Sequence, residues 1–126
     1  MKTKGNILIL LITLVACSFF MSACEKEDED VMVKYEIITN QPEDTYIEWT
    51  NRYGAVNGGR LSKANWFVTD NVHYHALRLE KGNEIVFSGV NTNPHRELEL
   101  KLYVNNKLVK TAKSDSGMKA EIRMKI

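Results

Sequence analysis

The stretch MKAEIRMKI, residues 118–126, alternates between apolar and charged side chains at every position. Successive side chains of a β-strand point to opposite faces of a sheet, so this period of two predicts a strand with one buried face and one solvated face. In a helix the same residues would be spread around the whole circumference and would form no apolar face. We therefore expect one side of this strand to face a core: Met118, Ala120, Ile122, Met124 and Ile126.

The same period recurs along most of the chain after residue 30. Further runs that favour strands occupy residues 31–37, 46–50, 72–79, 84–90, 98–104 and 107–112. Turn-forming residues separate these runs, and Asn105-Asn106 has the length of a tight hairpin turn and a residue type that tolerates positive φ. These features predict an all-β fold, a single small antiparallel β-sandwich of immunoglobulin-like type over residues 31–126. The irregular stretch 52–65 is expected to be a long loop.

Composition limits the classes to which the protein can belong. The chain has 126 residues, of which 44% are hydrophobic and 26% are charged, which predicts one small domain and excludes collagen-like and disordered classes. Residues 31–126 contain 14 basic and 11 acidic residues, a net charge of +3. A nucleic-acid-binding protein would need a concentrated basic stripe, so nucleic acid is not expected as a partner.

The N-terminal residues have the features of an export signal. Lys2 and Lys4 precede an uncharged stretch, residues 7–20, which would form a helix only about 21 Å long. This is too short to span a hydrocarbon core of about 30 Å, so residues 1–23 are expected to be a signal peptide. The small residues Ser22 and Ala23 stand directly before Cys24.

This order of basic start, apolar segment, small residues and cysteine resembles the lipobox of bacterial lipoproteins. The resemblance implies that Cys24 is lipidated and becomes the new N-terminus, with Met21 in place of the usual leucine. An acyl-modified cysteine would anchor the protein to the membrane, because each buried CH2 contributes about 0.8 kcal/mol. An ordinary secretory signal cleaved near Ala23, or an uncleaved anchor helix, remains an alternative.

Residues 25–30 contain five acids and one lysine, and with Cys24 they are expected to form a flexible, solvated tether over residues 24–30. The sequence that follows Cys24 also resembles the export signal of Bacteroidota surface lipoproteins. This resemblance implies an outer-membrane location on the cell surface. The alternative is that these residues are only a spacer and carry no targeting signal.

Within the domain, several short motifs follow one another in the order of a known group of domains. They are YEIIT at 35–39, YIEW at 46–49, Trp66, Gly82 and VNNKLV at 104–109. In this pattern the chain resembles the small immunoglobulin-like lipoprotein domains of Bacteroidota and, more distantly, the MmpS-type domain that accompanies mycobacterial lipid exporters. The second resemblance implies an accessory role in export.

His73 and His75 lie two residues apart on an expected strand, which places both imidazoles on one face about 7 Å apart. Such a pair can supply two zinc ligands, with a third from His95 or Glu80. A polar face turned to solvent explains the same spacing, and we expect this second arrangement, with no metal and no cofactor.

No set of catalytic residues is apparent in the sequence. Glu84, Glu97 and Glu99 alternate with apolar residues on the solvated side of strands, and Ser88-Gly89 lacks the context of a nucleophile elbow. We therefore expect that the protein is not an enzyme.

Aromatic residues gather in the N-terminal half of the domain, where they can fill the core or form contact surfaces. We expect Trp49 or Trp66 to lie in the core. Tyr53 and its neighbour Arg52 in the irregular stretch are the best exposed candidates for ligand or partner contact, and His73 and His75 are further candidates.

These features together predict a noncatalytic, membrane-anchored surface lipoprotein that acts as a binding or accessory module of an outer-membrane complex, for example in nutrient uptake. An accessory subunit of an envelope exporter or assembly machine is the alternative, and a small zinc-dependent enzyme is a third.

The anchor can be tested directly. If Cys24 carries the lipid, growth with a radioactive fatty acid labels the protein, and the Cys24→Ala variant loses the label and leaves the membrane fraction. Equal labelling of the variant would contradict the assignment.

Overall fold

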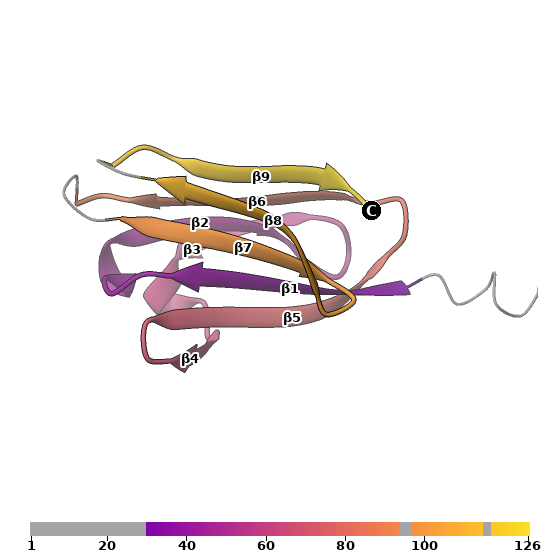
Figure 1. The fold of residues 1–126 in the computed structure, drawn as a ribbon, viewed down its shortest axis with the longest axis horizontal. Coiled ribbons are helices and arrows are strands. Elements are labelled where there is room, and N and C mark those ends of the chain that lie inside the picture. Colours follow the sequence, from indigo (N-terminus) through magenta and orange to yellow (C-terminus); the bar gives the residue numbers. More distant parts are fainter. Residues whose placement is uncertain (1–29, 94–96, 115–116) are drawn as a thin grey trace, which may run out of the picture.

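The computed structural model describes residues 30–93, 97–114 and 117–126 (Figure 1). The expected signal peptide, Cys24, the tether up to residue 29 and the possible zinc ligand His95 lie outside the described residues. Within the described ranges, no helix is long and apolar enough to cross a membrane.

The described part of the chain contains nine strands and two short 3-10 turns. The strands are β1 (Asp30–Ile38), β2 (Thr45–Thr50), β3 (Val56–Arg60), β4 (Phe67–Thr69), β5 (Val72–Glu80), β6 (Glu84–Asn91), β7 (Leu98–Val104), β8 (Lys107–Ser114) and β9 (Ala120–Lys125). The turns are η1 (Pro42–Asp44) and η2 (Leu61–Lys63). All seven strands expected from the period of two are therefore confirmed.

The strands form two antiparallel sheets that pack face to face (Figure 1). Sheet A has the order β4-β5-β1-β7-β8, and sheet B has the order β3-β2-β6-β9. The predicted all-β fold with a single small sandwich is confirmed.

The core is built from alternate residues of the strands that face each other. In β1, for example, Val33, Tyr35 and Ile37 are fully buried while their neighbours are more exposed. β9 follows the same pattern, and Ile122 is only 3% exposed. The alternation of apolar side chains thus sets which face of each sheet meets the other.

An aromatic cluster occupies the centre of this core. The Tyr35 ring lies 4.8 Å from that of Phe87, 6.2 Å from Trp49 and 6.3 Å from Trp66, between ring centroids. The Tyr35 hydroxyl donates a hydrogen bond of 2.7 Å to the carbonyl oxygen of Thr50. Trp66 is buried and Trp49 is half-buried, as the sequence led us to expect for at least one of the two.

The hairpin turn predicted at Asn105-Asn106 is confirmed. Both asparagines have positive φ, 50° and 66°, which matches the right-handed twist of the flanking strands β7 and β8. Asn105 also fixes the turn to β1. Its backbone amide donates to the Met32 carbonyl oxygen, and its side-chain oxygen accepts from the Met32 backbone amide.

Two expectations about the positions of strands were wrong. Residues 52–65 are not one long loop, since they contain β3, which pairs with β2, and η2. All five residues of β3 are exposed, so it is held by main-chain pairing and leaves no alternation for a sequence pattern to show. In addition, Met118 is 71% exposed, because β9 begins only at Ala120, after a turn in which Gly117 has positive φ.

The burial of β9 generates a stability prediction. Ile122→Asp places a carboxylate in the core without a partner and should lower the free energy of unfolding by about 3–5 kcal/mol. Glu121→Ala, at the neighbouring exposed position, should change it little, since surface ion pairs contribute little to stability. Chemical denaturation of both variants checks this, and similar midpoints would contradict the assigned register.

Candidate functional site

The two flanks of the sandwich differ in how well they are closed. Trp49 of β2 packs against His75 of β5 with ring centroids 4.8 Å apart, so these two strands face each other across the core. Their outer neighbours, β3 and β4, therefore lie on the same flank. On the opposite flank β8 and β9 approach each other, and Lys110 Nζ donates to the Arg123 carbonyl oxygen at 3.1 Å.

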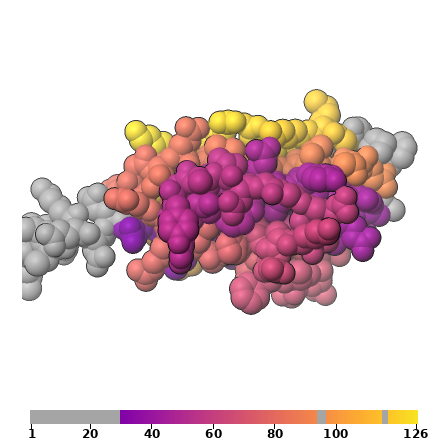
Figure 2. All heavy atoms as spheres, turned by 180° about the vertical axis from the view of Figure 1, so that it is seen from behind, coloured from indigo at the N-terminus to yellow at the C-terminus, as the bar shows by residue number. Residues whose placement is uncertain are grey.

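The β3 and β4 flank is open because its strands are short or carry small side chains. β4 pairs only with residues 72–74 of β5, so His75 to Glu80 have no strand partner on that side within the described ranges. Across from them, Asn57 and Gly59 share a sheet face with the inward-pointing Trp49 and Ile47. Figure 2 views the molecule from behind Figure 1, with the magenta spheres around β3 at the surface.

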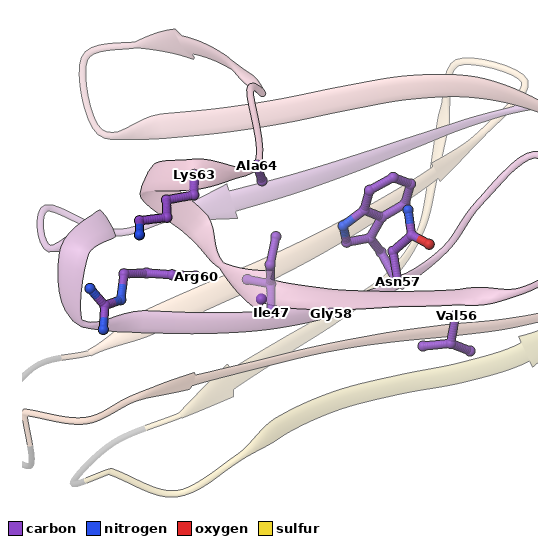
Figure 3. A pocket seen from close by; sticks show the side chains of 9 residues that line it. Ile47, Val56, Asn57, Gly58, Arg60, Lys63 and Ala64 are labelled. Carbon is purple, nitrogen blue, oxygen red and sulfur yellow. The ribbon is translucent and has the colours of Figure 1, made fainter.

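A groove runs along this flank as two adjoining hollows that share Trp49 and Asn57. The first has a volume of about 590 Å³ and lies along β3, with Ile47, Lys63 and Ala64 (Figure 3). The second has a volume of about 570 Å³ and lies between the turn after β2, which carries Asn51, Arg52 and Tyr53, and residues 75–78 of β5. We call these two hollows together the flank groove.

The lining of the flank groove combines aliphatic residues and glycines with basic, aromatic and amide-bearing side chains. No lining residue is acidic. Four lining residues, from four separate segments, are cations: Arg52, Arg60, Lys63 and Arg78. The Arg60 guanidinium donates to the hydroxyl of the exposed Tyr46 at 3.0 Å, so it is already engaged. The other three cations favour a ligand that carries negative charge.

The turn after β2 holds Arg52 and Tyr53 in place. The Asn51 side-chain oxygen accepts hydrogen bonds from the amides of Tyr53 at 2.9 Å and Ala55 at 3.1 Å, and the Asn51 amide donates to the Ala55 carbonyl oxygen at 2.7 Å. Gly54 has φ +82°, a conformation that favours glycine, and a Cβ there would lie 2.6 Å from the Asn83 side-chain oxygen, where the turn meets the β5–β6 connection.

Tyr53 is exposed, as the sequence led us to expect, with 77% of its surface accessible. The Arg52 guanidinium donates to the Tyr53 hydroxyl and lies 4.8 Å from the centre of its ring. The two side chains therefore act as one unit at the mouth of the flank groove.

The two histidine side chains lie on the inward face of β5 and not on its outer face, which corrects the expectation for this strand. Residues 73, 75, 77 and 79 form the inward face of β5, and His73 is only 6% exposed. His75 packs against both tryptophans, stacked on Trp66 at 5.7 Å and edge-on to Trp49. The periodicity of β5 did not reveal this because His73 and His75 are polar residues at core-facing positions.

Burial lowers the pKa of His73 and that of His75, and in His73 a hydrogen bond to the Thr39 backbone offsets part of the effect. Both histidines are therefore neutral at neutral pH. His75 lines the flank groove and His73 does not. In the described part of the chain no three His, Cys, Asp or Glu residues are grouped so as to hold a metal ion, and Glu80 is an exposed residue outside the inward face of β5.

Two of the three carboxylates considered for hydrolysis form ion pairs at the surface, and the third, Glu97, is exposed. Glu99 forms ion pairs with Lys101 at 3.9 Å and Lys113 at 3.7 Å, and Glu84 pairs with Arg123 at 3.5 Å. This fits the solvated role that their alternation with apolar residues indicated.

Comparison with known proteins adds no family to these observations: no family model matches the chain, and no curated protein matches it significantly.

Sequence reasoning named Arg52, Tyr53 and His75 but missed the other residues of the flank groove, among them Asn57, Lys63 and Arg78. These residues are far apart in the chain and meet only because β2 faces β5. The one local signal was Asn57-Gly58-Gly59, which brings little side-chain bulk to an edge strand.

The buried histidines generate a prediction about pH. Because each folded-state pKa lies below the unfolded value of about 6.5, the unfolded chain binds more protons, and stability should fall as the pH drops through that value. We expect the free energy of unfolding to decrease between pH 7 and pH 5.

The double variant with His73→Gln and His75→Gln should show a flatter pH dependence over this range, whatever its absolute stability. Denaturant titrations at several pH values measure this. The same slope in the variant as in the unchanged protein would contradict the burial of neutral imidazoles.

Proposed function

We propose that this protein is a noncatalytic, lipid-anchored binding module of the cell envelope, and that the flank groove is its contact site. The observation that carries the proposal is the groove itself, which is open to solvent, lined by four cations and no acid, and has Trp49 in both of its hollows. Tryptophan, tyrosine and arginine are the residues that most often dominate binding energy at protein contact sites.

The arrangement of side chains suits binding better than chemistry. The groove presents amides, guanidinium groups and aromatic rings, while His75 is turned toward the two tryptophans. The carboxylates Glu84 and Glu99 are engaged in ion pairs elsewhere. A base positioned beside a nucleophile, which acyl or phosphoryl transfer would need, is not found among the described residues that line the groove.

The second hollow of the groove lies near the end of the sandwich where the anchor would join. Asp30 pairs with Glu80 at the end of β5, and the turn after β2 packs on Asn83 in the connection that follows Glu80. A lipid on Cys24 would therefore hold the Arg52 and Tyr53 end of the domain close to the membrane. A partner within the outer membrane, such as a nutrient-uptake complex, would be within reach of this site.

Photo-crosslinking in living cells tests this proposal. A benzophenone amino acid at position 53 should form adducts with a specific outer-membrane transport protein, identified by mass spectrometry. The same amino acid at Lys107, which is exposed in the β7–β8 hairpin and does not line the groove, is the matched control and should not form these adducts.

Equal adducts at both positions, or none at position 53, would contradict the groove as a contact site. Adducts with components of an efflux complex would instead support the accessory role in export that the MmpS-type resemblance implies.

A further inference from the structure

We propose that the flank groove receives an extended, acidic peptide segment of a partner protein, which adds as a strand to the free edge of β5. This inference rests on the proposed function, because it specifies what the binding module binds.

The first support is the unpaired main chain of β5. All nine residues of β5 pair with β1 on one side, whereas β4 covers only the first three on the other. Alternate N–H and C=O groups between His75 and Glu80 therefore face the open side without a strand partner in the described ranges. An extended peptide that adds to an exposed edge satisfies such groups with main-chain hydrogen bonds.

The second support is the surface opposite this edge. A strand added beside β5 would continue sheet A past the end of β4 and would lie across from β3. The inward positions of β3 hold Asn57 and Gly59, and a Cβ built on Gly59 meets no atom within 4 Å. Facing sheets pack about 10 Å apart, so small residues on β3 leave room for the side chains of an added strand.

The third support is the chemistry of the groove. Alternate side chains of an added strand would point inward, where half-buried Trp49 and Leu77 provide an apolar floor. Its other side chains would point outward near Arg78, with Arg52 at the end of the groove. Apolar residues alternating with acids therefore fit both faces, and the cations favour the acidic segment.

A second copy of this chain fits the edge less well. Pairing β5 with β5 of another copy would bring two sets of Arg52 and Arg78 together, with Glu80 as the one acidic residue of β5 to offset their repulsion. The charges of the groove thus point to a partner of opposite sign.

Peptide binding to the detergent-purified full chain tests the proposal. The probe is a fluorescein-labelled nine-residue peptide in which valine and glutamate alternate, measured by fluorescence anisotropy. We expect saturable binding, and we expect the analogue with lysine in place of glutamate not to bind.

Two N-methylated probes distinguish strand addition from simple charge attraction. In one the valine amides are methylated, and in the other the glutamate amides are methylated, so that each probe loses hydrogen bonding along one edge only. Strand addition predicts that one of the two loses binding and the other retains it. Equal binding of both methylated probes, or equal binding of polygalacturonate, would overturn the proposal.

The double variant with Arg52→Glu and Arg78→Glu should bind the probe at least about tenfold more weakly, and Lys107→Glu is the matched control that should leave binding unchanged. Thermal melts confirm that both variants fold. Equal weakening by Lys107→Glu, or no binding by the unchanged protein, would overturn the proposal. Specific cross-links from position 53 without any peptide binding would overturn strand addition while leaving the proposed function intact.

Discussion

A hydrogen bond from the buried phenol group of Tyr35 connects the two sheets. Tyr35 stands in β1, at the centre of sheet A, and its hydroxyl donates to the Thr50 carbonyl oxygen at the end of β2 in sheet B. Burial strongly raises the pKa of Tyr35, so the hydroxyl stays protonated and remains a donor. Removing such a buried partner leaves a carbonyl group unsatisfied, at a cost of about 1–3 kcal/mol.

The constraint extends from this hydrogen bond to the candidate site. The Thr50 hydroxyl oxygen accepts from the Val86 amide at 2.9 Å, which joins β2 to β6 just beyond the point where their strand register ends. The next residue, Asn51, begins the turn that carries Arg52 and Tyr53. Since Thr50 is fixed from both sheets, the turn is presented in one position at the mouth of the flank groove.

The same packing explains why one flank is open. Tyr35, Trp49, Trp66 and His75 together place β2 over β5, so that the outermost strands β3 and β4 must close that side. β4 has only three residues and β3 carries small or polar side chains on its inward face. The open edge of β5 follows from the difference in length between neighbouring strands, which accounts for the groove and for the peptide-binding role proposed for it.

A strand could be predicted from the sequence where its buried face leaves a regular alternation of apolar and polar residues along the chain. Strands such as β7 and β9 were predictable, because Leu98, Leu100 and Ile122 alternate with charged residues. β3 could not be predicted in this way, because Gly58 and Gly59 pair through the main chain and bury no side chain. Tyr53 could be named from its place in an irregular stretch, whereas Arg78 and Asn57 join the site only through the way the sheets face each other.

Hydrogen exchange of the individual backbone amides of β5, followed by NMR, tests the central claim most directly. If β5 has a free edge beyond residue 74, alternate amides between His75 and Leu79 should exchange rapidly, while those between them, which pair with β1, should be as protected as the amides of β6. Uniform protection along the whole of β5 would contradict the account, because it would mean that this edge of the sheet is already covered.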